Sequence, residues 1–391
     1  HFYLEGQVAM AQPQEDGGML VYSSTQHPTE IQHTVAKVLG VPDAAVTAEV
    51  RRMGGGFGGK ESQANQWAAL ASVAASHTGR TCKIRLDRDD DMIMTGKRHD
   101  FKVNWQVGHD SEGRIRAVDM EFLARCGYSV DLSLGVNDRT LFHADSSYFY
   151  PDALIRSRRL RTDTCSNTAF RGFGGPQGML AAERMIDAIA ISLDKDPLEI
   201  RKLNFYDGER NLTPFGMPVE EFQVMHDLIA QLEESSDYWA RRDDVRFFNE
   251  NNAVLKKGLA LTPVKFGISF TLKHLNQAGA LVHLYTDGSI HLNHGGTEMG
   301  QGLYQKVAQV VAEEFGVSLN KVRITATNTS KVPNTGPTAA SSGTDLNAMA
   351  AKLAAKEIKN RLITFLCELH QCGPEAIFFG DNKVVVGDQS F

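Results

Sequence analysis

Apolar residues between positions 28 and 39 recur with the spacing of an α-helix. Ile31, Val35 and Val38 fall at i, i+4 and i+7, which places their side chains on one face of a helix. Gly40 follows directly, where a left-handed C-terminal cap belongs. The pattern therefore predicts a helix over 28–39 that ends at this glycine.

Similar patterns predict the other elements. Polar and apolar residues alternate from Phe101 to Val107, which is typical of a strand with one buried face. The three acids at 89–91 are expected to form a solvated turn after a strand over 83–86, not a metal site. The remaining predictions are a strand over 45–50, a helix over 61–77 that ends at Gly79, antiparallel strands within 101–130, a helix over 178–193, a strand over 258–271, and a hairpin over 280–293 that turns at Asp287-Gly288.

Two segments of the chain resemble each other. Residues 35–48 and 311–324 each read as a helix that ends in Gly-Val and leads into a short strand, with Gln26 before one helix and Gln301 before the other. Duplication and a chance recurrence of a common pattern account for this equally well. If duplication is right, the polar stretch 235–252, which is predicted to be irregular, is the expected boundary between two related domains.

Composition and charge narrow the class of protein. The 391 residues include 41 basic and 47 acidic side chains, a net charge of −6, which argues against a nucleic-acid binder. The five cysteines are scattered and none forms a Cys-x-x-Cys, which argues against a disulfide scaffold, a zinc ribbon or an iron–sulfur site. No apolar stretch has the length of a membrane helix. A reducing cytoplasmic location is the default expectation.

Glycine-rich loops are the main candidates for binding. Residues 54–59 fit a Gly-x-Gly-x-x-Gly fingerprint and most of a P-loop, but Glu61 replaces the P-loop hydroxyl and would repel a phosphate at the start of the expected helix. Small-residue loops also occur at 171–176, 295–302 and 338–343. If each opens a helix, the four helix N-termini could converge on one large polar, anionic group. The alternative is four unrelated tight turns.

The loop sequences resemble a known family. The matching strings are Met53–Glu61 (MGGGFGGKE), Asn167–Gly178 (NTAFRGFGGPQG), Lys265–Thr271 (KFGISFT), Asn276–His283 (NQAGALVH) and His294–Gly302 (HGGTEMGQG). In order and spacing they are similar to the molybdenum-binding region of the xanthine dehydrogenase family. The resemblance implies an α+β fold of mixed sheets and helices with two related molybdopterin-binding domains, 1–245 and 246–391, the second truncated.

The resemblance also implies roles for individual residues. The charged pair Glu61 and Arg139 would orient a purine and act in catalysis. Two rings, Phe173 and Phe270, would sandwich the purine, and Thr271 would hydrogen-bond beside them. The residues expected to bind the cofactor are Gln26, Phe57, Gly58, Arg171, Gln301 and Ala340, of which Gln26, Phe57, Arg171 and Ala340 would surround the molybdenum, largely through indirect contacts.

The implied reaction is the hydroxylation of hypoxanthine and xanthine to urate, with water as the oxygen source. Negative charge builds on the purine during such a reaction, and a guanidinium such as Arg139 would stabilise it. In the related aldehyde oxidases the counterparts of Glu61 and Arg139 are typically apolar, so finding both charged groups favours a purine. The alternatives are a hydroxylase of another N-heterocycle or of aldehydes, and a catalytically silent assembly module.

The resemblance finally implies parts outside this chain. The chain begins at His1, ends at Phe391 and lacks the glutamate that serves the family as catalytic base in a downstream glycine-rich segment. Iron–sulfur clusters and FAD are expected on other domains or subunits. The chain is therefore expected to be part of a molybdenum-binding subunit, inactive alone, whose partners are a purine, the rest of its own subunit and the iron–sulfur and flavin domains, with no nucleic acid or membrane.

Overall fold

The computed structural model describes residues 1–391, apart from the side chains of Ala340 and Ser341. The chain divides into two units. Unit 1 comprises residues 1–98, 168–171 and 268–391, and unit 2 comprises residues 99–167 and 172–267. Within the described part of the chain, no helix is both long and apolar enough to cross a membrane.

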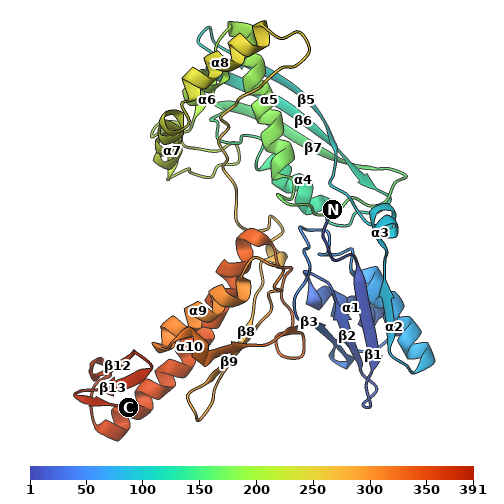
Figure 1. The fold of residues 1–391 in the computed structure, drawn as a ribbon, viewed down its shortest axis with the longest axis vertical. Coiled ribbons are helices and arrows are strands. Elements are labelled where there is room, and N and C mark those ends of the chain that lie inside the picture. The colour runs from blue at the N-terminus through green and yellow to red at the C-terminus, as the bar shows by residue number, and fades with distance from the viewer. The chain divides into compact units, whose positions relative to one another are not determined.

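The first half of unit 1 is a five-stranded sheet covered by two helices (Figure 1). The strand order is β11-β3-β2-β1-β4, and α1 and α2 pack on each other and on the sheet. Val21, Ile31, Val35 and Trp67 lie in the core between them. The elements are β1 (Val8–Pro13), β2 (Met19–Ser23), α1 (Pro28–Leu39), β3 (Val46–Val50), α2 (Asn65–Thr78), β4 (Cys82–Arg85), α3 (Arg88–Met94) and β11 (Thr327–Asn328).

The second half of unit 1 is a smaller sheet beside two helices. The strand order is β10-β9-β8, and a core that includes Leu292, Val307 and Ala351 lies between this sheet and α9 and α10. A separate three-stranded sheet ends the chain. The elements are β8 (Ala280–Leu284), β9 (Ile290–His294), α9 (Leu303–Phe315), β10 (Val322–Ile324), α10 (Ala340–His370), β12 (Ile377–Gly380), β13 (Lys383–Val386) and β14 (Gln389–Ser390).

The two halves of unit 1 repeat one order of elements. Each has an antiparallel hairpin, then a helix that ends at a left-handed glycine, then a 3₁₀ turn, then a strand parallel to the second hairpin strand. The closing glycines are Gly40, with φ of 70°, and Gly316, with φ of 64°. The structure therefore shows that the resemblance between residues 35–48 and 311–324 extends to their folds, which favours duplication over chance.

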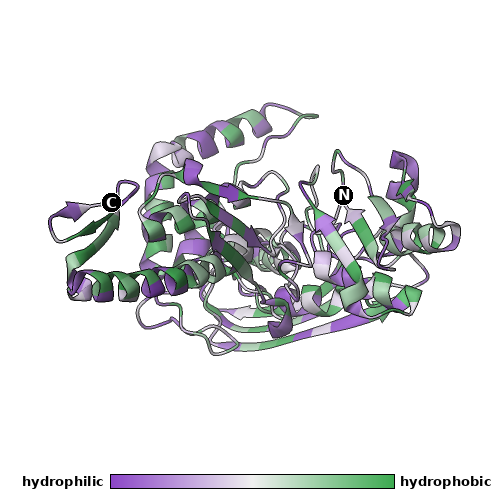
Figure 2. Ribbon diagram, turned by 90° about the horizontal axis from the view of Figure 1, so that it is seen from below, coloured by the Kyte–Doolittle hydropathy of each residue, from purple (hydrophilic) through white to green (hydrophobic). Residues whose placement is uncertain are grey.

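Unit 2 contains a mixed three-stranded sheet of order β5-β6-β7, against which helices pack. β5 and β6 are antiparallel and β6 and β7 parallel. Polar and apolar positions alternate along β5 and much of β6, which gives such strands banded colours in Figure 2. Arg201 on α6 is buried and joins α5 through Glu183 at 2.7 Å and Asp187 at 2.8 Å. The elements are β5 (Phe101–His109), β6 (Ile115–Gly127), α4 (Ser133–Leu141), β7 (Asp152–Arg161), α5 (Gly175–Leu193), α6 (Pro197–Asn204), α7 (Phe222–Ser235) and α8 (Tyr238–Glu250).

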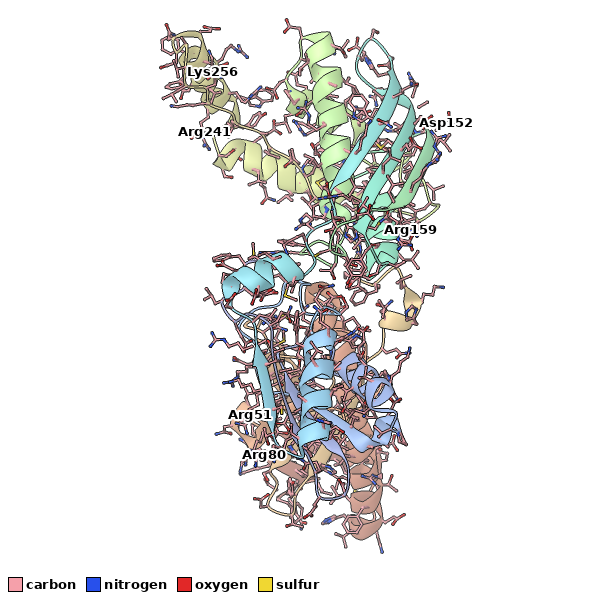
Figure 3. All side chains as sticks on the ribbon, turned by 90° about the vertical axis from the view of Figure 1, so that its right-hand side faces the viewer. Arg51, Arg80, Asp152, Arg159, Arg241 and Lys256 are labelled. Carbon is pink, nitrogen blue, oxygen red and sulfur yellow. The ribbon has the colours of Figure 1, made fainter. Side chains whose placement is uncertain are left out.

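The edge strand β7 is charged along its length. Asp152 is its first residue and Arg159 lies near its other end (Figure 3). Arg156 and Arg158 pair with carboxylates on β6. An edge strand lined with charges resists pairing with a further strand.

Four predictions about local structure are wrong. The segment 258–271 is not a strand, because around Gly267 its backbone bonds to side chains instead of to a sheet. The stretch 235–252 is mostly the helix α8. The helix expected at Glu61 begins at Asn65, because the carbonyl of Lys60 accepts from residues 25 and 26 rather than from a helical amide.

The fourth error concerns the three acids at 89–91. They lie in the short helix α3, and Asp91 is buried, accepting from the Tyr3 hydroxyl at 2.8 Å and the Gln7 amide at 2.9 Å. The sequence pattern gave no sign of these partners because they are more than 80 residues away. Among the described residues, no group of three or more His, Cys, Asp or Glu side chains could hold a metal ion.

Candidate active site

Gln26 ties together two loops that are distant in sequence. Its side chain is buried just before α1, and its Oε1 accepts from the Gly58 amide at 2.9 Å. Its Nε2 donates to the Thr338 carbonyl at 3.0 Å. The backbone follows the same path, since the Gln26 amide donates to Lys60 and the Thr338 amide donates to Gln26. Gln26 thus fixes residues 54–60, the glycine loop, against residues 335–338.

The shape of the glycine loop depends on missing side chains. A Cβ on Gly56 would lie 2.5 Å from Oε1 of Gln26. A Cβ on Gly58, which has φ of 95°, would lie 2.7 Å from the backbone of Ala169. Phe57 between them also has a left-handed φ, 56°, and its side chain is 48% exposed. A non-glycine residue held in this conformation is strained, so the surrounding bonds must maintain it.

Glu5 closes the glycine loop at both ends. At the start of the loop, Gly54 donates to the Glu5 carboxylate at 2.8 Å and accepts from its amide at 3.2 Å. At the other end, the buried Lys60 ammonium donates to the Glu5 carbonyl and to Ser24, both at 2.7 Å. The ammonium also lies 4.6 Å from the centre of the Tyr3 ring. These contacts anchor both ends of the glycine loop to Glu5.

Replacing Lys60 by Met is expected to lower stability more at pH 10 than at pH 7. Burial lowers the pKa of Lys60 from 10.5 to about 8, although Glu5 opposes the shift. Between those pH values the unfolded state binds a proton that the folded state has released, so the contribution of Lys60 to stability rises with pH. The difference in unfolding free energy between wild type and K60M should grow by about 1–3 kcal/mol between pH 7 and 10.

Urea unfolding at the two pH values measures this difference. The exposed Lys83 on β4 offers a matched control, since K83M should change stability equally at both pH values. An equal effect of K60M at pH 7 and pH 10 would contradict the assignment of a buried charge at Lys60.

Gln301 stabilises its own loop. Its Nε2 donates to the Thr297 carbonyl at 2.9 Å, and its Oε1 accepts from the Met299 amide at 2.7 Å. Glu298 accepts from the amides of Gly300, Gly302 and Tyr304, which outweigh burial and hold its pKa below the usual value. The N-terminus of α9 is therefore capped by a carboxylate of this chain, and an external anion would have to displace it.

Two buried polar atoms in this loop have no hydrogen-bond partner among the described residues. Nδ1 of His294 accepts from the Gly296 amide at 3.1 Å, so the ring proton is on Nε2. That Nε2, like the hydroxyl of Thr297, is buried and unpartnered. Burial lowers the pKa of His294 to about 4, so the ring is neutral at pH 7. A buried donor without a partner is costly, which favours a ligand acceptor at this place.

Residues 168–171 complete the cluster of loops in unit 1. The Arg171 amide donates to the Phe57 carbonyl at 2.9 Å, and the Arg171 carbonyl accepts from Arg98 at 2.8 Å. The Arg171 side chain is exposed. The Met53 amide donates to the Glu298 carbonyl at 3.0 Å, which joins the glycine loop to residues 294–302. Ala340 lies outside the residues whose side chains are described.

The expected substrate residues of unit 1 are mostly buried. Glu61 is 5% exposed and lies in the turn before α2, with its amide donating to the Gly58 carbonyl at 3.4 Å. Phe270 is 6% exposed, and both its backbone amide and its carbonyl bond to the Asn276 side chain at 2.9 Å. Thr271 follows it and is half-buried.

Arg139 and Phe173 lie in unit 2. Arg139 is buried on α4, where its Nη1 donates to the Gly267 carbonyl and its guanidinium lies 5.0 Å from the centre of the Phe266 ring. Phe173 has a left-handed φ of 50° in the turn before α5. A Cβ on the next residue, Gly174, would lie 2.0 Å from the Val136 carbonyl oxygen, so this turn packs directly on α4.

The structure thus brings Gln26, Phe57, Gly58 and Arg171 into one cluster with Thr338, and the cluster reaches the Gln301 loop through Glu298. All four small-residue loops contribute to it, but the loop 171–176 does so only through Arg171, because residues 172–176 belong to unit 2. Sequence reasoning missed Glu5, Lys60, His294 and Thr297. Lys60, His294 and Thr297 had one signal, their places in the strings that resemble the family, and Glu5 had none.

Two protein-family models match the chain, over residues 1–205 and 231–391, and both describe a molybdopterin cofactor-binding domain. The chain belongs to the molybdopterin cofactor-binding family. The predicted family and the predicted α+β fold of two related cofactor-binding domains are therefore confirmed. The predicted boundary between the two related domains, at residues 245 and 246, stays a prediction.

This molybdopterin-binding chain is similar to several curated enzymes. It is 46% identical over 93% of its length to a xanthine dehydrogenase of Blastobotrys adeninivorans and to a xanthine dehydrogenase/oxidase of Gallus gallus. It is 47% identical over 93% of its length to the nicotinate hydroxylase hnxS of Emericella nidulans. It covers 26% of the first of these proteins and 27% of the other two, so it spans about a quarter of their length.

Two solved structures show the same fold. Quinoline 2-oxidoreductase from Pseudomonas putida 86 superimposes with a TM-score of 0.81 at 23% identity, over 98% of this chain and 50% of that one. The aldehyde oxidoreductase of Desulfovibrio gigas gives 0.77 at 26% identity, over 91% of this chain and 39% of that one.

The residues of unit 1 fit a molybdopterin cofactor. A pterin has ring nitrogens and a carbonyl that can accept hydrogen bonds. Nε2 of His294 and the hydroxyl of Thr297 are buried donors without a partner among the described residues, so they could donate to such atoms. The glycine loop has no side chains at 54–56 and 58–59 to obstruct its backbone amides. Glu298 already accepts from the amides at the α9 N-terminus, so a cofactor phosphate could bind there only by displacing this carboxylate, and the expected convergence of helix N-termini stays a prediction.

Proposed function

We propose that this chain is the molybdenum-binding part of a xanthine dehydrogenase-type hydroxylase, which converts hypoxanthine and xanthine to urate with water as the oxygen source. The observation that carries the proposal is the loop cluster around Gln26, built from the strings that resemble the family. The 46% identity to xanthine dehydrogenases supports it.

The cofactor would be held by unit 1. Gln26, Phe57, Gly58, Arg171 and Ala340 would surround the molybdenum, and Gln301 would bind toward the pterin. When bound, the molybdenum cofactor supplies the redox chemistry and the transferred oxygen. The residues of the chain exclude water and set the position of the group, since Gln26 locks the glycine loop and Glu5 closes it.

The substrate would be oriented by charges and rings. The Arg139 guanidinium would offset the negative charge that develops on the purine; burial lowers its pKa, but arginine remains protonated in proteins. The buried Glu61 would accept from a ring N–H or share a proton with a ring nitrogen. Phe173 and Phe270 would sandwich the purine, and Thr271 would hydrogen-bond at its edge.

The rest of the reaction would need other parts of the protein. Iron–sulfur clusters and FAD on other domains or subunits would remove the electrons, and a downstream glutamate would act as base. The chain alone is therefore inactive under this proposal. We also propose that the two related domains divide at 245/246 and that the enzyme is cytoplasmic.

A second candidate is a hydroxylase of another N-heterocycle. The observation in its favour is the 47% identity to nicotinate hydroxylase, as high as that to xanthine dehydrogenases. A catalytically silent assembly module of the same fold is the third. Arg139 and Glu61 favour the purine over an aldehyde, but an anionic heterocycle such as nicotinate could also use a guanidinium.

Metal analysis and dye-coupled assays on the enzyme that contains this chain test the proposal. We expect molybdenum in the purified enzyme and faster dye reduction with xanthine than with nicotinate. Preference for nicotinate would support the second candidate, and molybdenum-loaded protein without turnover of either would support the third. The chain of residues 1–391 alone should show no xanthine-dependent reduction, and clear turnover would contradict its dependence on other parts.

A further inference from the structure

We propose that His143 is a positioning residue for substrate recognition, which orients the Arg139 guanidinium by fixing the backbone of Gly267 beside it. The inference rests on the proposed function, because it concerns the guanidinium assigned to the substrate. All the residues involved belong to unit 2.

The two polar backbone groups of Gly267 are held by one side chain from α4 and one from the turn after it. Its amide donates to Nε2 of His143 at 3.0 Å, and its carbonyl accepts from Nη1 of Arg139. Arg139 lies near the C-terminus of α4, and His143 lies two residues beyond the last residue of that helix, Leu141. A single residue is therefore clasped between the guanidinium and the imidazole.

The neighbouring ring strengthens the clasp. Phe266 lies 5.0 Å from the Arg139 guanidinium and 4.9 Å from the His143 ring, centre to centre. Lys265 pairs with the buried carboxylate of Asp145 at 2.7 Å. Residues 265–267 are thus attached to the chain after α4 at three successive positions, and His143 and Asp145 are both buried there.

The imidazole must be neutral and have its proton on Nδ1 to act in this way. Nδ1 lies 2.8 Å from the Arg139 carbonyl, which can only accept, so Nδ1 donates. Nε2 is then free of a proton and can accept from Gly267. Burial, with the charges of Arg139 and Lys265 adding to it, lowers the pKa of His143 to about 4, so the neutral form prevails at pH 7.

The position of the Arg139 guanidinium therefore depends on His143 through Gly267. His143 sets the position of the Gly267 amide, the peptide geometry of Gly267 sets its carbonyl, and the carbonyl sets one edge of the guanidinium. A Cβ on Gly267 would lie 3.2 Å from Nη1 of Arg139, so the approach is close. Without the imidazole acceptor the Gly267 amide would be left unpaired, and the segment would shift to satisfy it. A displacement of about 1 Å at a charge that orients substrate can cost about 100-fold in rate.

The test compares a substrate that needs the guanidinium with one that does not. In the complete enzyme, His143→Leu should lower kcat/KM for xanthine by about 10- to 100-fold. Turnover of a neutral aromatic aldehyde should change less than about 3-fold, because no negative purine ring has to be oriented. His143→Gln should restore most of the xanthine activity, since its Oε1 can accept from the Gly267 amide.

A matched control is available in the same unit. Nε2 of His226 bonds to the Tyr206 carbonyl at 2.9 Å and its ring packs on Phe205. His226→Leu also removes a structural imidazole, so it should affect xanthine and aldehyde equally. If H143L left the ratio of xanthine to aldehyde turnover unchanged, as is expected for H226L, the positioning role would be overturned.

A second measurement needs no variant to fold and no activity. The ¹⁵N spectrum of the histidine rings, with His143 assigned by through-bond connectivity, should show a neutral Nδ1–H ring at pH 7. An imidazolium or an Nε2–H ring there would overturn the inference. A wild-type enzyme with no xanthine turnover would instead count against the proposed function. The ring spectrum would still show whether His143 is in the form that accepts from the Gly267 amide.

Discussion

Replacing Glu61 by Val and Arg139 by Met together is expected to convert a purine hydroxylase into one that prefers aldehydes. Both side chains are buried, Glu61 at 5% and Arg139 at 4% exposure, so under the proposed function each charge would act in surroundings of low polarity, where its interaction with a purine would be strong. Removing a group that stabilises developing charge costs about 100-fold or more in rate. We expect kcat/KM for xanthine in the enzyme that contains this chain to fall by at least that factor, while aldehyde turnover is retained or rises.

Two comparisons make this result specific. Arg139→Lys keeps the charge but not the planar guanidinium, so its xanthine activity should lie between wild type and the double variant. Arg158→Met removes an exposed guanidinium that pairs with Glu121 on β6, and it should leave the ratio of xanthine to aldehyde turnover unchanged. Xanthine activity that survives both changes would show that the substrate is recognised in another way.

Local sequence patterns predicted the regular elements well where burial alone decides. The helix at 28–39 and its glycine cap, the antiparallel strands after 101 and the hairpin that turns at 287–288 are all present. In each, one apolar face meets a neighbour close in sequence. The chain order of the motif strings also sufficed to predict the family.

The patterns failed where a distant partner decides. Lys60 and Glu61 could have begun a helix, but residues 25 and 26 take the Lys60 carbonyl. Asp91 looked solvated, yet the N-terminal segment supplies its donors from more than 80 positions away. The segment around Gly267 alternates like a strand but is held by side chains of α4 and the turn after it. No local pattern encodes these contacts.

The candidate site was predicted only in part, for the same reason: distant contacts are not encoded locally. Gln26 was singled out by the resemblance to the family, but its role as the link between the glycine loop and Thr338 depends on a contact across 312 positions. Glu5 and His143 lie in none of the strings quoted for the family, and Lys60 lies in one of them without an expected role, although each holds a predicted site residue or loop in place. Motifs therefore identified the groups that would touch ligands, and the structure added the groups that position them.

Replacing Gln26 by Leu is expected to abolish retention of the cofactor. The change leaves the Gly58 amide and the Thr338 carbonyl without their partner, which costs about 1–3 kcal/mol for each buried group. The glycine loop and residues 335–338 would then separate, although Leu fills a similar volume. We expect molybdenum per protein, measured by elemental mass spectrometry, to fall at least about 10-fold, since a loss of 1.4 kcal/mol in binding is already tenfold.

Gln32 on α1 separates this effect from a loss of stability. Its buried side chain also joins two backbone groups, the Asp43 carbonyl at 3.0 Å and the Val46 carbonyl at 2.7 Å, but both lie in the neighbouring turn and strand, away from the glycine loop. Gln32→Leu should therefore lower the unfolding free energy about as much as Gln26→Leu and yet leave the molybdenum content near that of wild type. If the two variants lost molybdenum equally, the metal would be following overall stability, and Gln26 would have no specific part in holding the cofactor.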